Sequence, residues 1–105
     1  MKKKKIPTYY EDLMKRLKNA HYAEGYLNAA LEDDDKRVFL LALRYVAEAQ
    51  GSITKLAQLT QISREHLYRM LSEKGNPELV TLKTLLGALG LKLSIASKHR
   101  FKKAA

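Results

Sequence analysis

The side chains of this sequence best suited to chemistry are Arg64, Glu65 and Arg69, and that chemistry is the reading of DNA base pairs. An arginine can bind both acceptors of a guanine, and a glutamate can accept a hydrogen bond from the amino group of cytosine. On a helix from Ser63 to Leu71 whose inner face is apolar, Glu65 and Arg69 point outward. Arg64 lies in the first turn, where recognition helices most often meet base edges.

Other polar groups surround these three. His66 flanks the outward face and is predicted as a fourth base contact. The side chains predicted to contact DNA phosphates are Lys55, Ser63, Tyr68, Ser72 and Lys74. Less specific roles stay open for several of them. The arginines could contact phosphates only, Glu65 could pair with Arg69 four residues later, and Tyr68 could pack its ring on the scaffold.

The run from Ser52 to Leu71 predicts two short helices around a tight turn, the arrangement that presents side chains to the DNA major groove. Apolar and small residues recur at helical spacing in both halves, namely Leu56, Ala57 and Thr60, then Leu67, Met70 and Leu71. Ser52 and Ser63 are expected to cap the two helices, with Gln61 in the turn between them.

The charge of the chain favours a polyanionic partner. The sequence has 105 residues, enough for one domain, and a formal net charge of +9. Residues 1–35 hold seven basic and seven acidic groups, net zero; residues 36–75 hold seven and three, net +4; residues 76–105 hold six and one, net +5. The excess therefore lies with the helix pair and the C-terminal tail, which suits nucleic acid. Solubility alone is the alternative.

Other classes of function find little support. With no cysteine, a disulfide framework or cysteine metal site is impossible. His21, His66 and His99 lie in three separate segments, and the sequence has no HExxH pair, glycine-rich phosphate loop or nucleophile elbow. We therefore expect no enzyme, no metal and no cofactor. The absence of a long apolar run or signal core favours a cytoplasmic protein with no membrane partner.

Patterning divides the rest of the chain into helices. Residues 1–7 form a basic arm, and residues 8–35 a helical extension that begins at a Thr8 and Glu11 capping box. Its second helix, capped by Asn19, is expected to bury Tyr22, Ala23, Tyr26, Leu27, Ala30 and Leu31. The run Glu32-Asp33-Asp34-Asp35 reads as a junction in which Asp35 caps the next helix. That third helix, about 36–50, is expected to bury Val38, Phe39, Ala42, Tyr45, Val46 and Ala49.

The C-terminal part predicts one more helix and then a strand. Thr81 is expected to cap a helix whose core positions are Leu82, Leu85, Leu86 and Leu89. Leu91, Leu93 and Ile95 then alternate with polar or small residues, which is the period of a half-buried strand. One strand cannot satisfy its own backbone, so its partner must be the N-terminal arm or a second copy of the chain. We favour the second copy, because a two-fold dimer is also what a helix pair needs to read two half-sites. The predicted DNA-binding domain spans 36–96, and residues 97–105 form a basic tail.

The segments KLAQLTQISREHLYRMLSEKGNP and TLKTLLGALGLKLSI resemble the helix-turn-helix antitoxins called addiction-module antidote proteins. The resemblance covers about residues 22–96. It implies a mainly α fold of five to six helices, of the Cro/C1 DNA-binding type. It also implies an antitoxin of a type II toxin-antitoxin module, which represses its own operator as a dimer and neutralises a RelE/ParE-like toxin. Carried over by position, the base-reading residues are Arg64, Glu65, His66 and Arg69.

The sequence departs from the family pattern at two positions. The usual glycine of the turn is Gln61, so a residue with a side chain must adopt a left-handed or adjusted conformation, at a cost of about 1 kcal/mol. The glutamine that commonly begins the first helix of the pair, often a phosphate contact, is Ile53.

Two other functions stay open. The chain could be an interaction module that masks a toxin while DNA binding is secondary, in which case Tyr9, Tyr10, Tyr22 and Tyr26 of the extension are candidate interface anchors. Aromatic residues at helical spacing are also common in cores. The second alternative is a stand-alone phage-type repressor with no toxin partner.

Overall fold

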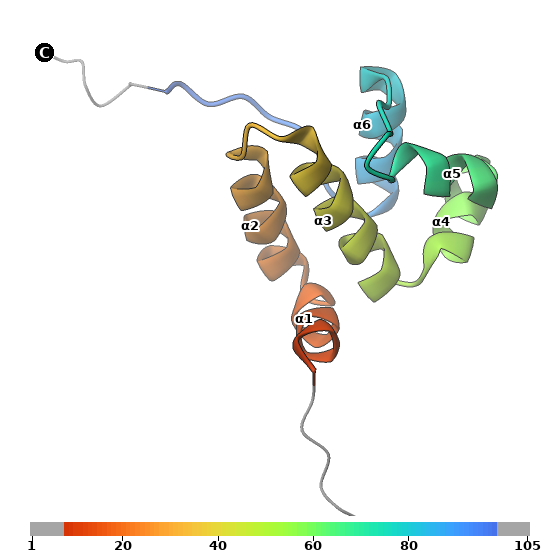
Figure 1. Cartoon of the computed structure of the whole chain (residues 1–105), viewed down its shortest axis with the longest axis horizontal. Coiled ribbons are helices and arrows are strands. Elements are labelled where there is room, and N and C mark those ends of the chain that lie inside the picture. The colour runs from red at the N-terminus through yellow and green to blue at the C-terminus, as the bar shows by residue number, and fades with distance from the viewer. Residues whose placement is uncertain (1–7, 99–105) are drawn as a thin grey trace, which may run out of the picture.

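The computed structural model describes residues 8–98, and within them the fold is entirely helical (Figure 1). The expected basic arm, residues 1–7, and most of the basic tail lie outside the described residues. The helices are α1 (Tyr9–Leu17), α2 (Ala20–Leu31), α3 (Lys36–Ala49), α4 (Ile53–Thr60), α5 (Arg64–Met70) and α6 (Leu79–Ala88). The prediction of a mainly α fold with five to six helices is confirmed. None of the helices in 8–98 has the length and apolar character needed to cross a membrane.

Local capping fixes where the first three helices begin. The Thr8 hydroxyl accepts a hydrogen bond from the Glu11 N–H, and the Glu11 carboxylate accepts one from the Thr8 N–H, which is the predicted capping box. Asn19 caps α2 by accepting from the N–H of Tyr22. Asp35 caps α3 by accepting from the N–H of Arg37. The acidic run before α3 is therefore a helix junction, as predicted.

Helix α3 lies at the centre of the fold (Figure 1). It packs against α1 and α2 on one side and against α4 on the other, while α4 also packs against α5 and α6. Seven of its residues are buried: Phe39, Leu40, Ala42, Leu43, Val46, Ala47 and Ala49. They belong to one hydrophobic cluster that also includes Leu13 and Leu17 of α1, Leu27 of α2 and Leu56 of α4. The extension and the helix pair therefore share a core.

The core differs from the predicted one at several positions. Val38 was expected inside but is 39% exposed, while Leu40 and Leu43 are buried without having been predicted. Tyr22 and Leu31 of α2 are also exposed, at 41% and 50%. Because α3 is covered from two sides, its buried surface is wider than the single stripe that a helical wheel assumes.

The predicted C-terminal strand is not present in residues 8–98. Residues 91–97 are extended, but beyond the bond from the Leu91 N–H to the Leu86 carbonyl, at 2.8 Å, residues 92–96 have no backbone hydrogen bond in the described chain. A strand needs a neighbouring strand for its ladder, and the fold provides only helices beside it. Pairing across a second copy of the chain stays a prediction.

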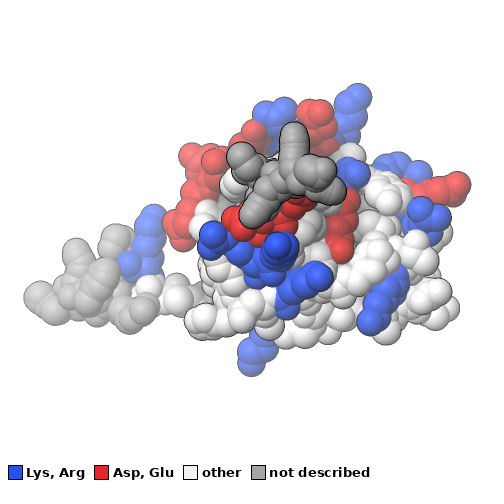
Figure 2. Space-filling model, turned by 90° about the horizontal axis from the view of Figure 1, so that it is seen from below, with Lys and Arg blue, Asp and Glu red and all other residues white. Residues whose placement is uncertain are grey.

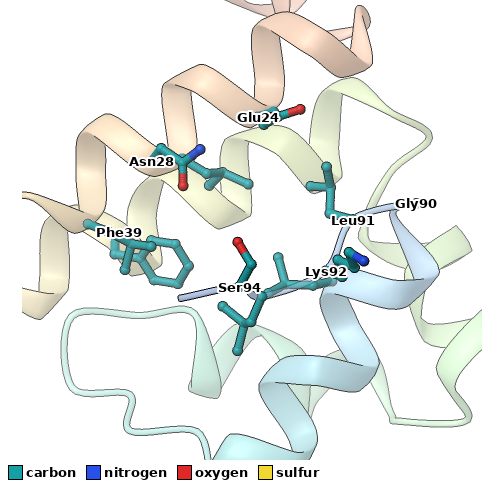
Figure 3. A pocket seen from close by; sticks show the side chains of 11 residues that line it. Glu24, Asn28, Phe39, Gly90, Leu91, Lys92 and Ser94 are labelled. Carbon is teal, nitrogen blue, oxygen red and sulfur yellow. The ribbon is translucent and has the colours of Figure 1, made fainter. Parts of the chain in front are cut away.

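The extended segment instead packs its leucines against the helices. Leu91 and Leu93 are half-buried against the core, and Ile95 is 99% exposed. A cavity of about 290 Å³ stays open beside the segment, where Glu24 and Asn28 of α2 lie across from Lys92 and Ser94 (Figure 3). The prediction that alternate residues face the core is therefore confirmed for Leu91 and Leu93 and wrong for Ile95.

Helix α6 begins earlier than predicted. Its N-cap is Glu78, which makes no side-chain capping bond, and Thr81 lies inside the helix. The expectation that Thr81 caps this helix is therefore wrong. The helix is fixed by packing instead, because Leu85 and Leu86 are buried in the shared core.

Gly75 provides the sharpest test of packing in this fold. A Cβ atom at Gly75 would lie 1.9 Å from the carbonyl oxygen of Met70, whereas one at Gly87 would meet no atom within 4 Å. We expect Gly75→Ala to lower the free energy of unfolding by about 1 to 3 kcal/mol, because the backbone must shift. Gly87→Ala, inside α6, should raise it by about 0.5 to 1 kcal/mol. Urea denaturation of both variants measures the difference, and equal stabilities would contradict the packing described.

Candidate nucleic-acid interface

The two helices α4 and α5 are joined by residues 61–63 in the arrangement predicted from sequence. Ser52 caps α4 by accepting from the N–H of Lys55, and Ser63 caps α5 by accepting from the N–H of His66. Gln61 has φ 65° and ψ 23°, so the expected left-handed residue is present in the turn. Its side-chain amide donates to the Gln58 carbonyl at 3.2 Å, which helps to hold the turn.

Packing fixes which face of α5 points outward. Leu67, Met70 and the following Leu71 are 0%, 8% and 1% exposed. The four predicted base-reading side chains, Arg64, Glu65, His66 and Arg69, are all exposed. The inner face assumed in the helical-wheel argument is thus confirmed, and the structure brings the four side chains onto one short helix.

The charged side chains of α5 are available to a ligand. Glu65 and Arg69 do not form the ion pair that their spacing allows, and within residues 8–98 neither they nor Arg64 make a side-chain hydrogen bond or salt bridge. A free guanidinium and a free carboxylate on an exposed helix can serve as donor and acceptor for base edges.

Other predicted contacts are held by the protein itself. The Tyr68 ring lies under the guanidinium of Arg44, 5.2 Å from its centroid, so the ring packs on the scaffold and only the hydroxyl is left for a phosphate. Ser72 donates its hydroxyl to the Arg69 carbonyl at 2.7 Å and would have to exchange that bond to reach DNA. Ser63 uses its oxygen as a cap, but its hydroxyl hydrogen can still be donated.

The remaining positions complete the surface around α5. Lys55 and Lys74 are exposed and carry no ion pair in the described chain. Ile53 is 3% exposed and belongs to the core, so the common phosphate contact at this position is absent. Thr54 and Gln58 were missed by the sequence reasoning, although their i, i+4 spacing placed them together. They line an open depression beside Arg64.

The charges of the described residues are separated along the chain. Residues 36–98 hold ten basic and four acidic groups, net +6, whereas residues 8–35 hold three and seven, net −4. Figure 2 shows one end of the molecule, on which acidic side chains gather in the upper half among basic ones, while the lower half carries scattered basic side chains on an otherwise uncharged surface. The basic excess of residues 36–98, which include α4 and α5, suits a polyanion, and the acidic excess of the extension would repel one.

An exposed ion pair connects the start of α3 with the segment after α5. Arg37 hydrogen-bonds the carboxylate of Asp35 and also lies 3.5 Å from a carboxylate oxygen of Glu73. These hydrogen bonds from Arg37 hold the pKa of the Asp35 carboxyl at about 2. Because that pKa is lowered, the Asp35 carboxylate that caps α3 stays charged above about pH 4. It becomes protonated only as the pH falls toward 2.

Comparison with known proteins places this surface in context. A family model described as "probable addiction module antidote protein" matches residues 8–97. An uncharacterized protein of Haemophilus influenzae is 33% identical over 84 residues, which are 80% of this chain and 86% of that protein. No solved structure matches the chain. The match includes all six helices, so it concerns the extension as well as the helix pair.

The left-handed turn is testable through Gln61. Glycine there would remove the Cβ strain, worth about 1 to 2 kcal/mol, while adding unfolded-state entropy worth about 0.5 to 1 kcal/mol. We therefore expect Gln61→Gly to raise the free energy of unfolding by up to about 1 kcal/mol in urea denaturation. The control is Gln58→Gly, three residues earlier within α4, which should lower it by about 1 kcal/mol. Destabilisation by both changes would show that Gln61 is not strained.

Proposed function

The chain belongs to the family of probable addiction module antidote proteins, and from that membership we propose that it is the DNA-binding antitoxin of a type II toxin-antitoxin module. In this proposal it binds its operator as a dimer, represses transcription and neutralises a RelE/ParE-like toxin in the cytoplasm. The helix pair α4–α5 is proposed to be of the Cro/C1 type, with α5 in the major groove.

The observation that carries the DNA-binding proposal is the unpaired, outward set of charged side chains on α5. Arg64, Glu65 and Arg69 are exposed on a helix whose opposite face is anchored by Leu67, which is fully buried. A solvated helix face commonly pairs its opposite charges at i, i+4, and here that pair is not made. Together with the net charge of +6 over residues 36–98, this supports a surface that binds phosphates and reads bases.

The dimer is proposed from the geometry of DNA reading. One seven-residue helix reaches only a few base pairs, and two copies related by a two-fold axis read two half-sites about one helical turn apart. Sedimentation of the protein with its upstream DNA measures this directly. We expect two chains per operator and a footprint with two-fold symmetry, and one chain per site would contradict the dimer.

The interaction module that masks a toxin is the second candidate, and one observation favours a part of it. The extension has net charge −4 and exposed tyrosines, so it is unsuited to DNA and suited to a protein partner. The two candidates are compatible if α5 binds DNA and the extension binds the toxin. A stand-alone repressor is less well supported, because the matched family is one of antidotes.

Arg69 tests the base-reading surface. If its guanidinium binds a base in bidentate fashion, Arg69→Ala should weaken operator binding by about 1 to 3 kcal/mol at fixed salt and relax specificity at one position. Gel shifts of the wild type and the variant on upstream DNA and on a scrambled duplex measure both effects. The matched control is Arg16→Ala on α1, which should leave operator affinity within about twofold. Equal affinities for Arg69→Ala and the wild type would remove Arg69 from the interface.

A further inference from the structure

The extension and α3 together present a second surface, which adjoins the DNA-binding side where Leu41 and Ser72 line one depression. Five of the six tyrosines of the chain lie on α1, α2 and α3. We call the tyrosine face the set of partly or fully exposed residues Tyr9, Tyr22, Tyr26, Val38, Leu41 and Tyr45. Tyr9 is 78% exposed, Leu41 45% and Val38 39%.

Part of the tyrosine face lines one depression between α2 and α3, with Tyr26, Val38 and Leu41 on its wall. Burial raises the pKa of Tyr26, and the hydroxyls of Tyr9, Tyr45 and Tyr22 raise it further. The depression has a volume of about 340 Å³, and Ala29, Ala30 and Ala42 complete its lining. A pocket lined by small residues and by larger apolar or amphipathic ones suits a protruding side chain of a partner.

The charge around this surface selects a basic partner. Residues 8–50, which form α1 to α3, are net −2 even with Lys36, Arg37 and Arg44 of α3 counted, and Glu32 and Asp34 have no side-chain partner within the described residues. Asp33 is also exposed, in the junction that follows α2. A nucleic acid would be repelled here, and so would a second copy that presented the same acidic extension.

One ring of the tyrosine face already lies beside a cation of the chain itself. The guanidinium of Arg16 lies 6.0 Å from the ring centroid of Tyr22. An incoming lysine or arginine could stack in the same way on Tyr9 or Tyr26, which carry no such cation in the described chain.

We propose that the tyrosine face is the docking surface for the toxin, and that it takes a basic segment with an apolar side chain for the depression; this assignment rests on the proposed antitoxin function. A toxin that acts on RNA needs a basic surface to hold its polyanionic substrate. An acidic, tyrosine-rich cover could neutralise that surface while leaving α5 free for DNA. The antitoxin would then bind the operator through α5 and the toxin through α1, α2 and the adjoining part of α3.

Two matched double variants test the assignment. Val38→Lys with Leu41→Lys puts two positive charges into the tyrosine face, and Leu79→Lys with Val80→Lys makes the same change on exposed residues of α6. The probe is the purified product of the gene adjacent to this one, titrated by calorimetry at fixed salt. We expect the first variant to bind at least tenfold more weakly, and the second within about threefold of the wild type.

Folding and DNA binding separate the possible outcomes. Circular dichroism and operator affinity check that each variant is folded. Tyr9→Ala, which removes a highly exposed ring, is a milder variant and should weaken binding of the adjacent gene product about threefold or more. Retained affinity in the first double variant and in Tyr9→Ala, or equal losses in both double variants, would overturn the tyrosine face while leaving the antitoxin proposal intact. If the wild-type chain itself did not bind the adjacent gene product, the antitoxin proposal and this assignment would both fall.

Discussion

The burial of α3 from two sides is the constraint on which the rest of this structure depends. Leu43 and Val46 are fully buried in the middle of the helix, and burying a side chain of this size contributes about 1.5 to 3 kcal/mol. No single neighbour could cover both sides, so α1 and α2 pack on one and α4 on the other. The hydrogen bond from the Gln50 side chain to the Leu17 carbonyl, at 3.1 Å, joins the far end of α3 to α1. The extension is therefore part of the core and not an appendage.

This central position places α3 where two segments of opposite net charge meet. The extension that covers α3 from the N-terminal side has net charge −4, and residues 36–98, which include α3 itself, have net charge +6. Because the field of a protein steers charged ligands, the acidic segment favours a basic partner and the basic segment a polyanion. Under the proposed function, the toxin and the DNA would therefore bind different parts of the chain.

Features set by a few neighbouring residues could be predicted from the sequence, and features that need a distant partner could not. The caps Thr8, Asn19, Asp35 and Ser63 are local hydrogen bonds, and each lies where the residue type and spacing placed it. Thr81 has the same residue type but is not a cap, because packing of α6 starts that helix earlier. The prediction of a C-terminal strand was wrong for a related reason. Alternation shows which side of a segment is apolar, whereas a strand also needs a neighbouring strand, which the sequence pattern does not contain.

The candidate site follows the same division. The outward direction of Arg69 could be predicted because Leu67 and Met70 fix the inner face of a short helix. The bond from Ser72 to the Arg69 carbonyl and the stacking of Arg44 on Tyr68 depend on the exact positions of neighbouring elements, and spacing alone could not show them. Val38 was misplaced because a helical wheel ranks apolar residues by direction and does not distinguish a core from an exposed apolar face.

The orientation of α5 is governed by the core beneath α4 more than by the turn that joins them. Helix α4 has eight residues, too few to be stable alone, and it is flanked by two residues with positive φ, Ser52 at 120° and Gln61 at 65°. Such strained residues persist only where the surrounding packing determines the backbone. Here Ile53 and Leu56 provide that packing, at 3% and 2% exposure. A side chain is therefore tolerated where a glycine would relieve the strain, since the direction of α5 is already fixed by buried residues on either side of the turn.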